Sequence, residues 1–299
     1  MNSSLFSIRG TRIYVEDYNP ECEEVLLYLH GGPGASCVDF CLFQAKALSA
    51  SLRVIAIDQR GVLRSDPIGT NERFGINDLI DDLEDVRVHL NISRWTVLGH
   101  SFGGYLAVRY ALDYPDSVKK IVFETPCFDV LRATKSIIST ARIYCIKNQR
   151  SQGIELCNYY LNKDHSAKVM WNALGEVFQA LGEDKDILYV HGITPQHYNE
   201  MIDSKISSNH MWDKNIIHNQ KLQDKGEFFE NLIPRLSEIS QPTVLFTGAY
   251  DPVCCIEQQK GYLDHIKNGT IINFERSAHF PRLEEPEKYT TEVLKFIFN

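Results

Sequence analysis

The chain has 299 residues, with 31 basic and 39 acidic side chains, which gives a formal net charge of −8. A hydrophobic fraction of 43% and a charged fraction of 23% are ordinary for a folded globular protein, and they exclude disordered and low-complexity classes. No block of lysine and arginine is present that could neutralise phosphates, so no nucleic-acid partner is expected.

The sequence also gives expectations about location and cysteine chemistry. No apolar run approaches the roughly 20 residues that cross a bilayer, and residues 1–10 lack the pattern of a signal peptide. We therefore expect a cytoplasmic protein without membrane contact, in which the eight cysteines are free thiols. Cys37 and Cys41 have no second ligand pair nearby, so no metal site is expected. The sequence leaves the oligomeric state open.

Strand-like and helix-like patterns alternate through the first third of the chain. Short segments on either side of the turn at residues 9–11 predict a hairpin. Continuous apolar runs, typical of strands covered on both faces, follow at residues 25–30, 53–58, 95–98 and 120–124. Helices are expected over residues 38–52, 78–90 and 101–114. This alternation predicts an α/β fold with a mostly parallel central sheet flanked by helices.

The strand signal is missing from about residue 130 to about residue 236, where apolar residues recur at helical spacing. Further strands are expected at residues 242–247 and 270–274, and further helices over 256–266 and 286–298. The sequence therefore predicts a core formed by residues 1–129 and 237–299. An inserted helical cap is expected over residues 130–236.

The segment Gly99-His100-Ser101-Phe102-Gly103 stands between a predicted strand and a predicted helix. In this context the G-x-S-x-G pattern predicts a nucleophile elbow, a tight turn that exposes the hydroxyl of Ser101 at a helix N-terminus. The alternative is a serine that caps the helix after a glycine turn.

The segment His30-Gly31-Gly32-Pro33-Gly34 follows the predicted strand 25–30. Its glycines allow backbone N–H groups to approach a bound oxygen closely, as an oxyanion hole requires. The expected donors are the amides of Gly32 and Phe102, with Gly31 as the second choice. The alternative is an ordinary strand-to-helix turn rich in glycine and proline.

A serine nucleophile needs a base, and the base needs a carboxylate that orients it. Asp251 directly follows the strand predicted at 242–247, and His279 follows the strand predicted at 270–274. Functional residues in open parallel sheets lie at such carboxyl ends of strands. Glu124 is the alternative acid, but the turn around Asp251 and its spacing of 28 residues from His279 favour Asp251.

With these residues in place, the chain resembles the α/β-hydrolase superfamily and, within it, the proline iminopeptidase-like group of serine aminopeptidases. The resemblance rests on HGGPG at 30–34, DQRG at 58–61, GHSFGG at 99–104, GAYDPV at 248–253 and SAHFP at 277–281. It implies the α/β-hydrolase fold with a Ser101–His279–Asp251 triad and neither cofactor nor metal. The implied substrate is a short peptide that loses its N-terminal residue through an acyl-enzyme.

Two positions depart from the pattern of that group. Leu63 stands where the group commonly has a small residue, and Pro252 stands where some relatives have a carboxylate that grips the substrate amine. Candidates in the predicted cap for that carboxylate are Glu155, Glu176, Glu183 and Glu200, none of which aligns with a family motif. The substrate-binding residues are therefore left unknown.

Three functions are compatible with these motifs. The first is an aminopeptidase that acts on short peptides. The second is a carboxylesterase, lactonase or amidase that acts on a small metabolite with the same triad. The third, ranked last, is a receptor that keeps the triad, binds a ligand and does not hydrolyse it.

Overall fold

The computed structural model describes residues 2–203, 206 and 209–299 of the chain. Within these residues eight strands form one sheet in the order β1-β2-β4-β3-β5-β6-β7-β8. The strands are β1 (Asn2–Ile8), β2 (Thr11–Tyr18), β3 (Val25–Leu29), β4 (Arg53–Asp58), β5 (Trp95–His100), β6 (Val118–Glu124), β7 (Thr243–Gly248) and β8 (Thr270–Phe274). β2 pairs antiparallel with β1 and β4, and every other pair is parallel. The predicted α/β architecture with a mostly parallel sheet is confirmed.

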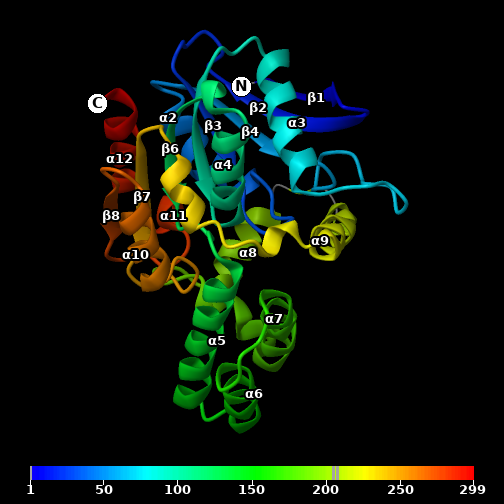
Figure 1. Ribbon diagram of the computed structural model, residues 1–299, viewed down its shortest axis with the longest axis vertical. Coiled ribbons are helices and arrows are strands. Elements are labelled where there is room, and N and C mark those ends of the chain that lie inside the picture. The colour runs from blue at the N-terminus through cyan, green and yellow to red at the C-terminus, as the bar shows by residue number, and fades with distance from the viewer. Residues whose placement is uncertain (1, 204–205, 207–208) are drawn as a thin grey trace.

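Two groups of helices cover the two faces of the sheet (Figure 1). One face packs against α3 (Ile76–His89), α4 (Phe102–Asp113) and α10 (Ile256–His265). The other face packs against α12 (Pro286–Phe298) and a composite helix made of α1 (Val38–Phe40), the π-helix η1 (Cys41–Ala45) and α2 (Lys46–Leu48). The short helix α11 (Pro281–Glu284) directly precedes α12.

The burial of β3 shows why its sequence is apolar without interruption. All five of its residues are buried, and successive side chains of a strand point to opposite faces of the sheet. Leu27 lies in the core beside α3 and α4, whereas Leu26 and Tyr28 lie in the core beside α12. Both faces therefore need apolar residues, which removes the alternation of a half-exposed strand.

The chain between β6 and β7 is helical. Its helices are α5 (Val130–Lys147), α6 (Ser151–Leu161), α7 (Ala167–Leu181), α8 (Pro195–Asp203) and α9 (Lys214–Lys225). In Figure 1, α5, α6 and α7 extend away from the sheet as one packed group, and α8 and α9 lie nearer the sheet. Residues 204, 205, 207 and 208 of the predicted cap lie outside the described residues. The function of this helical segment as a cap stays a prediction.

Short 3-10 helices complete the described structure. They are η2 (Pro115–Ser117), η3 (Gly182–Leu188), η4 (Asn209–Trp212), η5 (Glu227–Phe229) and η6 (Pro234–Glu238). None of the helices in the described part of the chain combines the length and the apolar character needed to span a bilayer.

Candidate active site

Ser101 lies at the turn between β5 and α4, with backbone angles φ 54° and ψ −118°. This strained conformation requires close contacts on both sides of the serine. A Cβ at Gly99 would lie 2.3 Å from the carbonyl oxygen of Gly103, and a Cβ at Gly103 would lie 2.1 Å from that of Leu29. The turn therefore tolerates only glycine at both positions. The side chain of Ser101 makes no capping hydrogen bond to α4, so the capping alternative is wrong.

Asp251 and His279 meet at the carboxyl ends of β7 and β8. The Nδ1 atom of His279 lies 2.9 Å from Oδ1 of Asp251, and both side chains are almost fully buried. Because an ionised carboxylate only accepts hydrogen bonds, Nδ1 of His279 carries the proton. The Nε2 atom is then left with a free lone pair, as a general base requires.

Glu124, the alternative acid, has other partners. Its carboxylate accepts hydrogen bonds from Arg282 Nη1 at 2.8 Å and from the Tyr289 hydroxyl at 3.0 Å. Burial raises the pKa of Glu124, and the guanidinium of Arg282 opposes that shift. Asp251 and not Glu124 is therefore the carboxylate that contacts His279.

A cavity of about 720 Å³ brings the predicted site residues together. Ser101, His279, Gly31, Gly32 and Phe102 all line it. A Cβ at Gly31 would lie 2.9 Å from the Cβ of Ser101, so glycine lets this loop approach the serine closely. Among the described residues a hydrogen bond joins His279 to Asp251, and none joins the Ser101 hydroxyl to the imidazole.

Much of the remaining cavity wall is apolar, and part of it comes from the helical segment. The contributing side chains from α5 and α7 include Val130, Ile137, Trp171, Leu174 and Phe178. Apolar walls with a few polar groups are usual for sites that bind small molecules.

Two carboxylates also line the cavity, and no sequence pattern singles out either of them. Asp39 is buried and is held by Arg282 and by the Tyr198 hydroxyl at 3.3 Å. The side chain of Asp186 in η3 is 31% exposed and pairs with Lys185 at 2.6 Å. None of the four glutamates suggested from the sequence lines the cavity, so the structure does not favour them as the amine-binding carboxylate: Glu155, Glu176, Glu183 and Glu200.

Thr125 is a further site residue that sequence reasoning misses. It follows β6 with φ 41°, which is unusual for a β-branched side chain. Its hydroxyl donates to the carbonyl oxygen of His279 at 3.0 Å and lies 3.1 Å from Nδ1 of His100. Burial lowers the pKa of His100 well below its usual value, so that ring stays neutral and its Nδ1–H donates to the hydroxyl. Thr125 thus holds the backbone of His279 in place.

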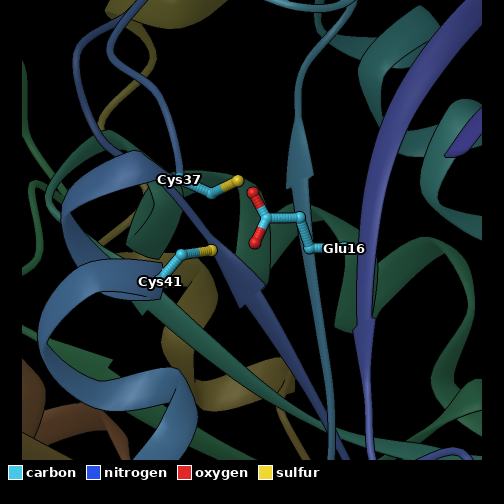
Figure 2. Close-up of side chains that lie close together, drawn as sticks. All are labelled: Glu16, Cys37 and Cys41. Atoms are coloured by element: carbon cyan, nitrogen blue, oxygen red, sulfur yellow. The ribbon is translucent and has the colours of Figure 1, made fainter. Parts of the chain in front are cut away.

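A second cluster offers metal-ligating atoms away from the cavity. Ligand atoms of Glu16, Cys37 and Cys41 all lie within 4.8 Å of one another (Figure 2). However, Arg64 places Nη1 2.5 Å from Glu16 and Nη2 3.2 Å from the Cys37 sulfur. Burial also raises the pKa of both thiols, which opposes the thiolates that a metal needs. The cluster is thus already neutralised by a guanidinium.

Comparison with known proteins agrees with the fold described above. Residues 24–143 match the protein family described as alpha/beta hydrolase fold. The proline iminopeptidase of Heyndrickxia coagulans is 27% identical over 282 residues, which cover 91% of this chain and 90% of that protein. The proline iminopeptidase of Clostridioides difficile (strain 630) is also 27% identical, over 292 residues that cover 93% and 91% of the two chains.

Solved structures show the same fold at lower identity. The proline iminopeptidase of Mycobacterium smegmatis superposes with a TM-score of 0.75 at 20% identity, covering 99% of this chain and 98% of that one. An esterase from Exiguobacterium antarcticum superposes with a TM-score of 0.64 at 21% identity, covering all of both chains. The chain therefore is a hydrolase with the α/β-hydrolase fold that is similar, over most of its length, to proline iminopeptidases.

Proposed function

We propose that the protein is a serine aminopeptidase that removes N-terminal residues, proline among them, from short peptides. The observation that carries the proposal is one cavity lined by the strained Ser101, by the His279 that Asp251 orients, and by the carboxylate of Asp186. A carboxylate in such a cavity offers an ion pair to the free amine of a peptide substrate.

In the proposed mechanism, Nε2 of His279 takes the proton of Ser101 as Oγ attacks the carbonyl carbon of the substrate. The amides of Gly32 and Phe102 hold the oxyanion, and Phe102 adds the positive end of the α4 dipole. Asp251 stabilises the imidazolium, which then protonates the leaving amine. A water molecule, deprotonated by His279, releases the acyl group and restores Ser101.

The helical segment is proposed as a cap that selects substrates by size. Helices α5 and α7 supply part of the cavity wall, and a volume of about 720 Å³ is in the range of pockets for small ligands. A folded protein substrate does not fit such a cavity, whereas a short peptide does.

A second candidate function is a carboxylesterase, lactonase or amidase that acts on a small metabolite. The apolar wall formed by α5 and α7 favours it, because such a wall binds an uncharged acyl group as well as a peptide side chain. The triad and oxyanion donors would act in the same way on an ester.

The two candidates are separated by matched substrates. We expect hydrolysis of prolyl and alanyl 4-nitroanilides with a free amine, and little hydrolysis of their N-acetylated forms. Activity confined to acetylated anilides or to p-nitrophenyl esters would rule out the aminopeptidase. In both cases the Ser101→Ala variant should lose turnover.

Asp186→Asn tests the amine-binding carboxylate. We expect it to raise KM for free-amine substrates by about tenfold, because one ion pair is lost, and to leave KM for esters unchanged. Glu183→Gln in the same 3-10 helix is the matched control, since Glu183 does not line the cavity.

A further inference from the structure

Leu63, one of the two residues that depart from the family pattern, has an unfavourable backbone conformation. Its φ is 35°, in the left-handed region that favours glycine, and its side chain is fully buried. A bulky residue keeps such a conformation only where the surrounding structure holds it. The contacts that hold Leu63 therefore indicate what its side chain and backbone do.

The side chain of Leu63 joins the core to the helical segment. It forms a small buried cluster with Val38 and Val62 that is separate from the two main cores. Partly buried residues from both parts of the chain pack against this cluster. Leu42 belongs to the core, and four residues belong to the helical segment, namely Ile202, Ile206, Met211 and Trp212. A glycine at position 63 would remove the largest of the three buried side chains from this contact between α8, η4 and the core.

The backbone of Leu63 is held by a side chain from α9. Its N–H donates to Oδ1 of Asn215 at 3.3 Å, while Nδ2 of the same amide donates to the carbonyl oxygen of Gly34. One partner is an N–H group and the other is a carbonyl, so the two ends of this buried amide are not interchangeable. Asn215 thus bridges the loop after β4 and the loop after β3.

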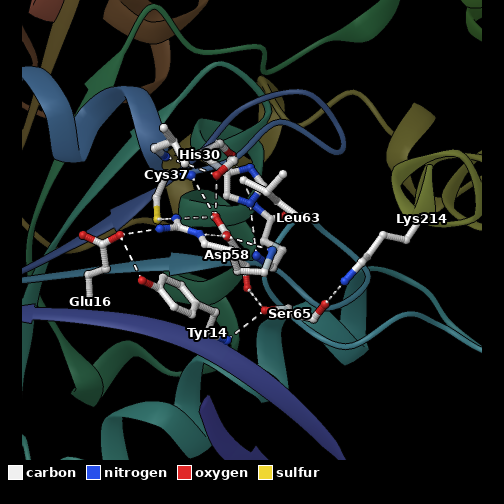
Figure 3. A network of polar contacts seen from close by, with 12 residues as sticks. Tyr14, Glu16, His30, Cys37, Asp58, Leu63, Ser65 and Lys214 are labelled. Carbon is white, nitrogen blue, oxygen red and sulfur yellow. Dashed lines mark hydrogen bonds and ion pairs between the residues drawn. The ribbon is translucent and has the colours of Figure 1, made fainter. Parts of the chain in front are cut away.

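Neighbouring contacts tie the same two loops together. Asp58 accepts hydrogen bonds from the Ser36 hydroxyl at 2.6 Å and from the Arg64 amide at 3.2 Å (Figure 3). Lys214, at the start of α9, donates to the carbonyl oxygen of Ser65 at 2.7 Å (Figure 3). The two loops are therefore joined by Asp58 from the core and by α9 from the helical segment.

We propose that Asn215 and Leu63 are positioning residues through which α9 fixes the Gly31–Gly34 loop and, with it, the Gly32 amide. This role rests on the proposed function, in which Gly32 donates to the oxyanion. Neither Asn215 nor Leu63 lines the cavity, so both act through the loop and not on the substrate. An oxyanion donor acts in the transition state, so its displacement lowers kcat and leaves KM nearly unchanged.

Asn215→Asp tests the bond to Gly34. The variant keeps an oxygen for the Leu63 amide but sets a carboxylate oxygen against the Gly34 carbonyl. We expect kcat to fall roughly tenfold or more, since loss of a whole oxyanion donor costs on the order of 10²- to 10³-fold. We also expect the ratio of variant to wild-type kcat to recover at acidic pH, because a protonated carboxyl group donates again.

Lys221→Ala is the matched control on the same helix. Lys221 bonds the carbonyl oxygens of Thr70 and Glu72, away from the Gly31–Gly34 loop. The Lys221→Ala variant should weaken the contact between α9 and residues 70–72 without changing kcat. If Asn215→Asp behaves like Lys221→Ala at every pH, the positioning role is wrong.

Hydrogen exchange gives a readout that does not depend on turnover. In the Ser101→Ala background, we expect Asn215→Leu and Leu63→Gly each to speed amide exchange in both 31–37 and 60–66. Unchanged exchange in residues 31–37 would overturn the positioning role of Asn215 and Leu63, even if the wild type is an active peptidase. If the variants exchange faster but the wild type hydrolyses none of the panel substrates, Asn215 and Leu63 still position the loop, and the proposed function is wrong.

Discussion

Asp251 accepts more than the hydrogen bond of His279. The backbone amides of Val253 and Cys254 donate to its two oxygens at 2.9 Å and 3.0 Å. These bonds come from the turn that directly follows Asp251, so the backbone orients the carboxylate independently of His279. Orientation of a general base by such a fixed acceptor is what separates a triad from a chance contact.

Asp251→Asn should therefore abolish most of the activity. An amide nitrogen facing Nδ1 would favour the opposite tautomer of His279, and the loss should be on the order of 10⁴-fold in kcat by analogy with other triads. Glu124→Gln should reduce stability through Arg282 and leave most of kcat. Steady-state kinetics on both purified variants checks this, and near-full activity of Asp251→Asn with an inactive Glu124→Gln would reverse the assignment.

Thr125→Val tests whether the Thr125 hydroxyl positions His279 through its hydrogen bond to the His279 carbonyl oxygen. Valine keeps the shape and the β-branched strain of threonine but leaves the His279 carbonyl and His100 Nδ1 without their common partner. We expect a loss of about 1 to 3 kcal/mol of stability, measured by urea unfolding, and a fall in kcat. Thr125→Ser keeps the hydroxyl and should recover kcat. A Thr125→Val variant with wild-type kcat would show that this hydroxyl is only structural.

Helix α5 forms part of the cavity wall, and its first turn is held by a side-chain cap. Asp129 accepts from the amides of Leu131 at 2.9 Å and Arg132 at 3.3 Å, and it also pairs with the Arg132 side chain. Asp129→Ala should cost about 1 kcal/mol of unfolding free energy, whereas Asp129→Asn, which keeps an acceptor, should cost less. Urea unfolding monitored by circular dichroism measures both. Equal losses of unfolding free energy in the two variants would show that the negative charge of Asp129, and not its capping hydrogen bonds, stabilises the helix.

Among the secondary-structure elements, the strands are the most predictable from the sequence. β3, β4, β5 and β7 are buried on both faces, so both faces need apolar side chains and the sequence shows continuous apolar runs there. The single helix expected over residues 38–52 is instead α1, the π-helix η1 and α2. Apolar spacing does not distinguish a π-turn from an α-turn, because both place similar residues on the buried side.

The site was predictable where residues follow strands directly. Ser101, Asp251 and His279 come from turns whose place in a parallel sheet is set by chain order. Asp186 and Asn215 were not predictable, because their positions depend on how the helical segment folds back. Asn215 contacts Gly34, which is 181 residues away in the chain, and no local pattern encodes such a contact.

The whole molecule carries several buried neutral histidines at contacts between distant segments. Burial lowers the pKa of His30 and His100 beside the cavity, and it lowers the pKa of His218 in α9 to about 3. The Nδ1 atom of His218 lies 2.7 Å from the carbonyl oxygen of Arg60, and Nε2 has no hydrogen-bond partner among the described residues. Protonation would therefore place an unpaired N–H and a charge between α9 and the core.

This burial predicts how stability depends on pH. A histidine whose folded pKa lies below its unfolded value binds fewer protons when folded, so stability is fully present above the unfolded pKa and falls as pH decreases toward the folded pKa. For His218 the affected range extends from about pH 6.5 down to about pH 3, and the loss between pH 7 and pH 5 is about 2 kcal/mol.

His218→Asn keeps a donor for the Arg60 carbonyl but removes the titrating group. We expect the variant to be less stable than the wild type at pH 7, because the smaller side chain leaves space. Between pH 7 and pH 5, however, it should lose about 2 kcal/mol less than the wild type loses. Urea unfolding at both pH values measures the difference, with His197→Gln as the control because His197 is exposed. Parallel losses in the wild type and His218→Asn would mean that acid unfolds the protein by way of other groups.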